Sequence, residues 1–228
     1  MQLPAMGGIF NSMNLAMYTY THQNPVKLID PDGRLTIFVH GTFASPQSAD
    51  ADFIEALSKT YKEKVVQFDW SGPSGGSSGS GAENSSSARR NPGARLAAFI
   101  NSYKLAEGEK INIVGHSHGG NVIKEASRQL NSDKKLSSVV FLGTPHRGSH
   151  KFNNGAVAGN AQLLNVYDTS DLIQLLGQGL DGASRDLSGF SHRRVETPNN
   201  GYIPLYTRLV DDHSNLDSKQ VWETLRVE

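Results

Sequence analysis

Short runs of apolar, largely β-branched residues alternate along the chain with segments in which apolar residues recur every three or four positions. The runs predict β-strands, and the spaced segments predict amphipathic helices. The predicted strands are Leu35–His40, Val65–Trp70, Ile111–Val114, Val139–Leu142, Leu163–Tyr167 and Leu205–Val210. Strands that alternate with helices are typical of a mostly parallel sheet flanked by helices on both faces. The expected fold class is therefore α/β.

Helices are predicted in the stretches between these strands. One carries Phe53, Ile54, Leu57 and Tyr61, the next follows Asn91–Pro92, a third spans Val122–Leu130, and the last carries Val221, Trp222 and Leu225. Asn91 is a suitable helix cap and Pro92 suits a first helical position, which places the start of the second helix there.

The first 34 residues differ from the rest. Met1–Ile29 contains no Asp or Glu and has no sustained period, and the turn sequence Asp30–Gly33 follows it. We therefore divide the chain into a short irregular extension, residues 1–34, and a domain of residues 35–228. Ser71–Ser87 is rich in Gly and Ser, which predicts either a flexible loop without a function or a mobile rim of an active site.

Composition narrows the function classes. The chain of 228 residues carries 22 Lys and Arg against 22 Asp and Glu, a neutral balance that argues against a nucleic-acid partner. The absence of cysteine excludes disulfides, thiol catalysis and cysteine–zinc sites. No apolar run approaches the ~20 residues of a membrane span, and no basic residue precedes Lys27, so no signal peptide is expected. Neutrality also means that attraction to anionic lipid must come from local patches such as Arg89–Arg90 or Arg193–Arg194.

The main chemical motif is Gly115-His116-Ser117-His118-Gly119, which matches G-x-S-x-G. It directly follows a predicted strand and precedes a predicted helix, the setting that a nucleophile elbow requires. Ser117 is therefore the candidate nucleophile. The backbone N–H of His118, at the start of the helix, is a candidate oxyanion donor.

A serine nucleophile needs a base, and the base needs an acid that orients it. In this kind of fold the acid and then the histidine follow the serine along the chain, which leaves His213 and His192 as candidates. We favour His213, because it follows a predicted strand. Asp171 is favoured over Asp168 as the acid, although Asp171 could instead begin a helix and Asp168 could be a turn residue.

The second oxyanion donor is expected in the loop after the first strand, where His40-Gly41-Thr42-Phe43 lies. The backbone N–H of Thr42 or Phe43 is the candidate, unless the segment only ends the strand. His116 and His118 could also be read as a metal-binding pair. No carboxylate or third histidine follows at ligand spacing, so neither a metal nor a cofactor is expected.

The motifs HGTF, GHSHGG and LGTPHRGS (Leu142–Ser149) resemble those of bacterial lipases and lipase-like esterases of the α/β-hydrolase fold. The resemblance runs from about Leu35 to the C-terminus and supports Ser117 as nucleophile. It also supports the loops DTSDLIQ and DDHSNL as carriers of the acid and the histidine. The stretch after LGTPHRGS is short, which implies a small lid and argues against long-chain triglycerides as substrates.

The N-terminal segment MNLAMYTYTHQNPVKLIDPDG resembles the end of the core associated with rearrangement-hotspot (Rhs) repeats. In that family a large shell encloses a variable C-terminal toxin that is released by aspartyl self-cleavage, here expected around Arg34–Leu35. The upstream Asp-Pro partner motif is missing, so this chain alone is not expected to self-cleave, and it is compatible with a fragment of a longer polypeptide. The resemblance implies secretion into a target bacterial cell as a type VI effector, with the Rhs shell and a cognate immunity protein as partners.

Taken together, these features predict an antibacterial lipase or phospholipase that hydrolyses lipid esters at the membrane surface of a target cell through an acyl-enzyme. Two alternatives stay open. One is an esterase or amidase that acts on small or cell-wall substrates through the same triad. The other is a catalytically inert binding module on a hydrolase scaffold.

Overall fold

A computed structural model describes residues 34–42, 44–46, 49–70, 86–105, 108–146, 150–171, 174, 187–196, 213–225 and 227. Its strands are β1 (Arg34–Val39), β2 (Val65–Phe68), β3 (Lys110–His116), β4 (Leu136–Leu142), β5 (Val157–Asp168) and β6 (Ser191–Val195). Its helices are α1 (Ala51–Tyr61), α2 (Ser86–Ser102), α3 (His118–Ser127) and α6 (Lys219–Leu225), with the short 3-10 turns η5 (Asn154–Ala156) and η6 (Asn215–Asp217).

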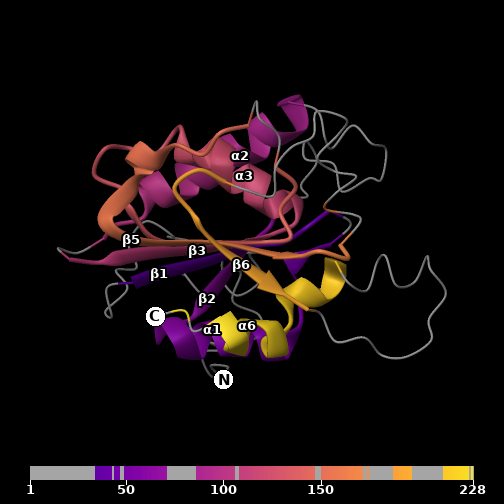
Figure 1. The fold of residues 1–228 in the computed structure, drawn as a ribbon. Helices are drawn as coiled ribbons and strands as arrows, with labels where there is room; N and C mark the ends of the chain where they lie inside the picture. Colours follow the sequence, from indigo (N-terminus) through magenta and orange to yellow (C-terminus); the bar gives the residue numbers. More distant parts are fainter. Residues whose placement is uncertain are drawn as a thin grey trace, which may run out of the picture.

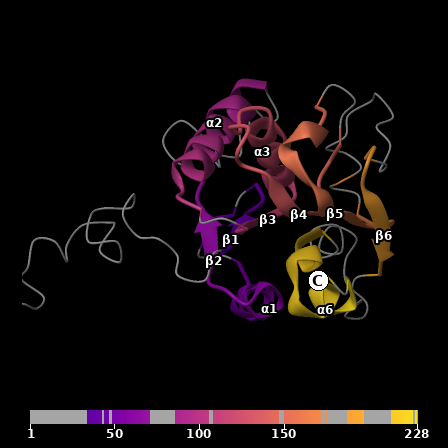
Figure 2. The ribbon, with the colours of Figure 1, turned by 90° about the vertical axis from the view of Figure 1, so that its left-hand side faces the viewer.

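Within the described residues the strands form one sheet in the order β2-β1-β3-β4-β5-β6, and every pairing in it is parallel. Helices α2 and α3 cover one face, and α1 and α6 cover the other (Figures 1 and 2). The expected α/β class is confirmed. Because the strands are parallel, all of their carboxyl ends meet at the same edge of the sheet.

The order of the strands reverses between β1 and β3. From β1 the chain crosses through α1 to β2, and from β2 it crosses back through α2 to β3 on the other side of β1. The two crossing helices lie on opposite faces, so a crevice opens at the carboxyl ends of β1 and β3. Ligands of open parallel sheets bind at such a switch point.

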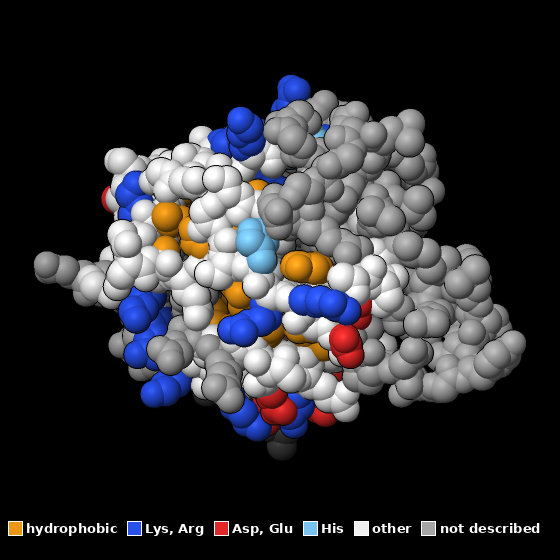
Figure 3. Space-filling view, viewed as in Figure 1, with side chains coloured by type: hydrophobic (Ala, Val, Ile, Leu, Met, Phe, Trp, Pro, Cys, Tyr) orange, Lys and Arg blue, Asp and Glu red, His pale blue; other side chains and the backbone are white. Residues whose placement is uncertain are grey.

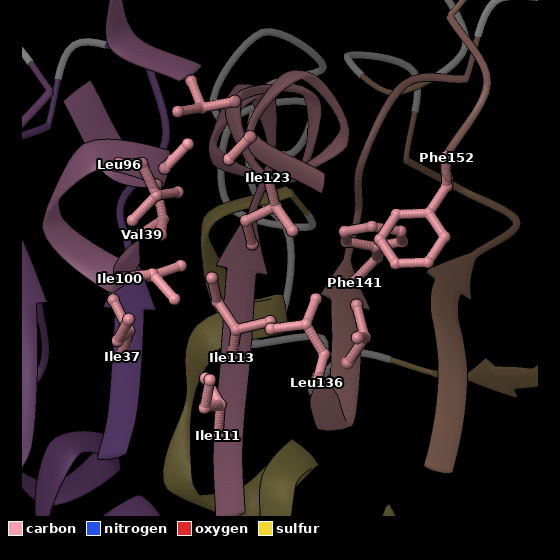
Figure 4. Packing of buried hydrophobic residues seen from close by; sticks show 14 of the residues in the cluster. Ile37, Val39, Leu96, Ile100, Ile111, Ile113, Ile123, Leu136, Phe141 and Phe152 are labelled. Atoms are coloured by element: carbon pink, nitrogen blue, oxygen red, sulfur yellow. The ribbon is translucent and has the colours of Figure 1, made fainter. Parts of the chain in front are cut away.

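Side chains that alternate along each strand build a core on each face of the sheet. Ile37 and Val39 of β1 pack with Leu96 and Ile100 of α2 on one face (Figure 4). Phe38, between them in sequence, points to the other face and packs edge-on against Phe53 of α1, with ring centroids 5.4 Å apart. A strand buried on both faces reads as a continuous apolar run, as β1 does.

The expected start of the second helix is wrong. Helix α2 begins at Ser86, so Pro92 lies inside the helix rather than at its start. Proline there removes one backbone hydrogen bond. The neighbouring Gly93 lets α3 approach closely, since a Cβ at this position would lie 2.5 Å from the Cβ of Glu125.

The edge of the sheet also differs from the expectation. The stretch Ser191–Val195, which contains His192 and is not among the predicted strands, forms β6 and pairs with β5. Its side chains are almost all exposed, so an edge strand of this kind carries no alternation of apolar residues to reveal it. The expected strand Leu205–Val210 lies outside the described residues, as do the Gly/Ser-rich stretch 71–85 and residues 1–33.

Candidate active site

Ser117 lies at the switch point, between the end of β3 and the start of α3. Its backbone has φ 51° and ψ −129°, in the region that L-residues rarely adopt. The surrounding glycines make room for this turn. A Cβ at Gly115 would lie 2.6 Å from Ile123 Cδ1, and a Cβ at Gly119 would overlap the carbonyl oxygens of Val39 and His40. The glycines of the motif therefore allow the turn to pack against β1 and α3.

His213, in the described segment that begins directly before η6, faces the serine hydroxyl. Its Nε2 lies 2.8 Å from Ser117 Oγ, and its Nδ1 lies 2.7 Å from Asp171 Oδ2. All three side chains are buried, with exposed fractions of 5%, 6% and 0% for the serine, the histidine and the aspartate. The arrangement can hold a proton on Nδ1 and leave Nε2 free to accept the serine proton.

The two candidate acids have different surroundings. Asp171 uses Oδ2 for His213, while its Oδ1 accepts the backbone N–H of Gln174 at 2.8 Å. The carboxylate therefore also satisfies a backbone donor three residues on, as a helix-starting residue does. Asp168, at the end of β5, accepts the backbone N–H and the hydroxyl of Ser170 at 2.8 and 2.6 Å. Both of these contacts lie in the turn that directly follows β5.

His192 faces a different neighbour. Its Nδ1 lies 3.4 Å from the amide nitrogen of Asn165, its register partner on β5. The structure therefore brings together Ser117, Asp171 and His213, and it places Asp168 and His192 in other contacts.

Two segments provide backbone N–H groups near the hydroxyl. His118 is the first residue of α3, so its backbone N–H is among those that have no acceptor within the helix. The loop after β1 passes beside the serine, since a Cβ at Gly41 would lie 3.0 Å from Ser117 Cβ. Thr42 follows directly, whereas Phe43 lies outside the described residues. An oxyanion near Ser117 would thus be close to the helix N-terminus and to the loop after β1.

Trp70 holds the loop after β1 in place. Its indole N–H donates to the carbonyl of His40 at 2.7 Å, and its ring stacks on the His40 ring with centroids 5.4 Å apart. Burial lowers the pKa of His40, which Asp69 partly opposes from 3.5 Å away. His40 is therefore a neutral packing residue at neutral pH.

Sequence reasoning missed the residues that hold the LGTPHRGS segment. Lys124 of α3 is fully buried and its Nζ lies 2.6 Å from His146 Nδ1. His146 Nε2 in turn lies 2.9 Å from Asn165 Oδ1. Gln174 donates to the carbonyl of Thr144 at 3.0 Å, which ties the segment to the acid loop. The only sequence signal for these contacts is that Lys124 and Asn165 are polar residues within segments whose apolar residues predict a helix and a strand.

Other features of the described residues bear on cofactors and membranes. They contain no group of three His, Asp or Glu side chains that could hold a metal ion. Among the helices in the described ranges, none is both long and apolar enough to cross a bilayer.

The sequence matches a protein family over residues 30–203, a range that includes the serine and the acid loop. That family is described as "Putative serine esterase (DUF676)". The chain belongs to this family.

Individual relatives are more distant. Lipase 1 of Staphylococcus aureus is 27% identical over 128 residues, which cover 45% of this chain and 18% of the length of that lipase. Dienelactone hydrolase from Anabaena variabilis is 17% identical and covers 86% of this chain and 85% of its own, with a TM-score of 0.47. An acetylxylan esterase is 23% identical over 49% of this chain and 63% of its own, with a TM-score of 0.39.

Proposed function

We propose that this serine esterase family member hydrolyses carboxylic esters through Ser117, His213 and Asp171. The observation that carries the proposal is the continuous line of contacts from Asp171 Oδ2 through the imidazole to Ser117 Oγ, with separations of 2.7 and 2.8 Å. A serine held at positive φ between a strand and a helix supports the same role.

The reaction proceeds in two halves. Ser117 Oγ attacks the ester carbonyl while His213 Nε2 takes its proton, and the imidazolium is stabilised by Asp171. The tetrahedral oxyanion accepts hydrogen bonds from the backbone N–H of His118 and from that of Thr42 or Phe43. His213 then protonates the leaving alkoxide, and an acyl-enzyme remains on Ser117. Water, deprotonated by His213, releases the acid and restores the serine. No cofactor takes part.

We further propose that the substrate is a phospholipid and that the protein is an Rhs-associated antibacterial toxin. The support is the lipase-like motif set together with the Rhs-like segment of residues 1–34. Hydrolysis of membrane lipid would make such an enzyme harmful to a target cell. A cognate immunity protein and the Rhs shell are the partners that this role requires.

The test is fatty-acid release from phospholipid vesicles by the wild type and by Ser117→Ala. We expect release by the wild type and a loss of at least about a thousandfold in the variant. Release that the substitution leaves unchanged would contradict the role of Ser117. Hydrolysis of a short soluble ester, without release from vesicles, would favour the small-substrate esterase instead.

The toxin role has a separate test. Expression of the full chain in a susceptible bacterium should arrest growth, and Ser117→Ala should not. A fluorophosphonate probe distinguishes the inert-scaffold alternative, because it labels only an activated serine. A folded wild-type protein that resists the probe would exclude catalysis by Ser117.

A further inference from the structure

His116, the residue between Gly115 and Ser117 in the elbow motif, is buried and contacts the backbone of the proposed base, His213. Its Nε2 lies 3.0 Å from the backbone carbonyl oxygen of His213, and the two imidazole rings are 5.0 Å apart between centroids. A carbonyl only accepts hydrogen bonds, so His116 donates through an Nε2–H.

The same ring has a second contact with the loop of the base. Its Nδ1 lies 3.5 Å from Oδ2 of Asp217, at the end of η6 and four residues beyond His213. Between these two points the loop buries Leu216 completely. His116 therefore contacts the loop at its start and at its end.

Burial lowers the pKa of His116, and Asp217 partly opposes this. The ring is accordingly neutral at neutral pH, with one proton to place. The carbonyl of His213 lies at hydrogen-bond distance, and the carboxylate of Asp217 lies beyond it, so the proton belongs on Nε2.

We propose that His116 is a positioning residue that holds the 213–217 loop and thereby sets the place of the His213 imidazole relative to Ser117. The inference rests on the proposed function of the triad. The two residues it links, His116 and His213, are 97 positions apart in sequence. Ser117 follows His116 directly, so one strand end carries both the nucleophile and the group that holds its base.

The expected effect comes from geometry. A displacement of about 1 Å between reacting groups can reduce a rate by roughly a hundredfold. Loss of the His116 contact frees the carbonyl of His213 without removing any group that touches the substrate. The turnover number should therefore fall while KM stays nearly unchanged.

Three substitutions separate the contact from the mere presence of a side chain. In His116→Gln the side-chain amide nitrogen is as many bonds from the backbone as the Nε2 of the original histidine, so it can donate to the His213 carbonyl. In His116→Asn the amide nitrogen extends only as far as the Nδ1 of the original histidine, so it is too short to donate to the His213 carbonyl. In His116→Phe the ring is kept and both nitrogens are lost. Thermal unfolding of each variant establishes that it is folded.

We expect kcat for a soluble p-nitrophenyl ester to fall about 10- to 100-fold in the Phe and Asn variants, with KM within about twofold. The Gln variant should keep kcat within about threefold of the wild type. Fluorophosphonate labelling of Ser117 should slow in parallel with kcat.

Two results would overturn the inference while leaving the triad intact. One is a folded Phe variant that turns over and labels like the wild type. The other is a Gln variant as impaired as Phe. If the wild type itself neither labels at Ser117 nor hydrolyses the ester, the proposed function fails, and the inference falls with it.

Discussion

Ser117 adopts a backbone conformation that costs on the order of 1–3 kcal/mol, and close packing of the glycines around it holds it there. Gly119 has little room on its β1 side. A methyl group at this position would overlap the carbonyl oxygens of Val39 and His40, at the end of β1. The motif therefore requires glycine for packing as much as for the turn.

Gly119→Ala should lower the free energy of unfolding by about 1–3 kcal/mol, because the added methyl pushes α3 away from β1. Urea denaturation followed by circular dichroism measures the change. Gly159→Ala in β5 is the matched control, since a Cβ there has no atom within 4 Å, and its effect should stay within about 0.5 kcal/mol. Equal effects of the two substitutions would contradict the packing argument.

The acid can be identified by paired substitutions. Asp171→Asn should reduce kcat by about 10³- to 10⁴-fold, because an amide there cannot hold the Nδ1 proton of His213 in the same way. Asp168→Asn should leave kcat within about threefold, since that side chain binds Ser170 in its own turn. Ester hydrolysis and unfolding measured on both variants form the test. A large loss of kcat confined to Asp168→Asn would assign the acid to that residue.

At the scale of single elements, the pattern of apolar residues predicts strands and helices correctly where their burial is regular. It fails where the burial is irregular. The continuous apolar runs of β1, β3 and β4 predict strands because both faces of these strands are covered. The edge strand β6 lacks such a pattern because solvent faces it. The Asn91–Pro92 signal does not mark the start of α2, because Pro92 is tolerated inside a helix that packs closely on α3.

Helix α3 places Lys124 in the core, where it contacts His146. Burial, with smaller contributions from Arg128 and Arg89, lowers the pKa of Lys124 from 10.5 to about 7, and Glu125 opposes this. Burial likewise lowers the pKa of His146 to about 3. Above about pH 7 the folded protein therefore holds Lys124 mainly as the neutral amine, and below that pH the buried charge lowers the free energy of unfolding.

Lys124→Met should change how stability depends on pH. Between pH 7 and 10.5 the unfolded chain binds a proton on Lys124 that the folded protein does not. The free energy of unfolding of the wild type should thus rise across this range, by at most about 1.4 kcal/mol per pH unit from this group. Below pH 7 both states hold the proton, so the penalty is constant there.

Urea denaturation at pH 7 and pH 9 measures this dependence. The difference in stability between the wild type and Lys124→Met should move in favour of the wild type as pH rises. Lys135→Met is the matched control, because it makes the same substitution at an exposed lysine that donates to the carbonyl of Gly155. A difference that does not change with pH would show that Lys124 stays charged in the folded protein.

The whole molecule has no net charge, so any attraction to an anionic membrane is local. Arg89 is 4% exposed and its guanidinium lies 2.7 Å from His150, which removes it as a lipid contact. Arg193 and Arg194 are exposed on β6 and line a cavity of about 560 Å³ beside α6. On the same face of the molecule, Lys and Arg side chains lie beside hydrophobic ones (Figure 3).

Arg193 and Arg194 lie near the carboxyl ends of the strands, where substrate is expected to enter. His116 pairs with Leu142, Leu142 with Val166, and Val166 with Arg193, so the arginine is level with the end of β3. On the proposed phospholipase function, we expect these two arginines to contact the membrane surface.

Reversal of both charges, Arg193→Glu with Arg194→Glu, should weaken binding to anionic phospholipid vesicles by more than about tenfold, since each basic residue contributes about 1 kcal/mol. Lys62→Glu with Lys110→Glu makes the same change in charge at the amino ends of the strands and should have a smaller effect. Cosedimentation measures both, and the difference should shrink in 1 M salt. Equal losses would indicate that only net charge matters.

The sequence by itself determined the α/β class and nominated a serine, an acid loop and a histidine. These follow from features that are local in the chain: buried strands, and a glycine-flanked turn between a strand and a helix. Their catalytic roles remain predictions. The tertiary structure decided which side chains meet, because Ser117 and His213 are 96 residues apart and His213 and Asp171 are 42 apart. It also decided the exposed strand β6, the buried lysine and the contact of His116 with the base loop. Those depend on packing between distant segments, which leaves no periodic signal in the chain.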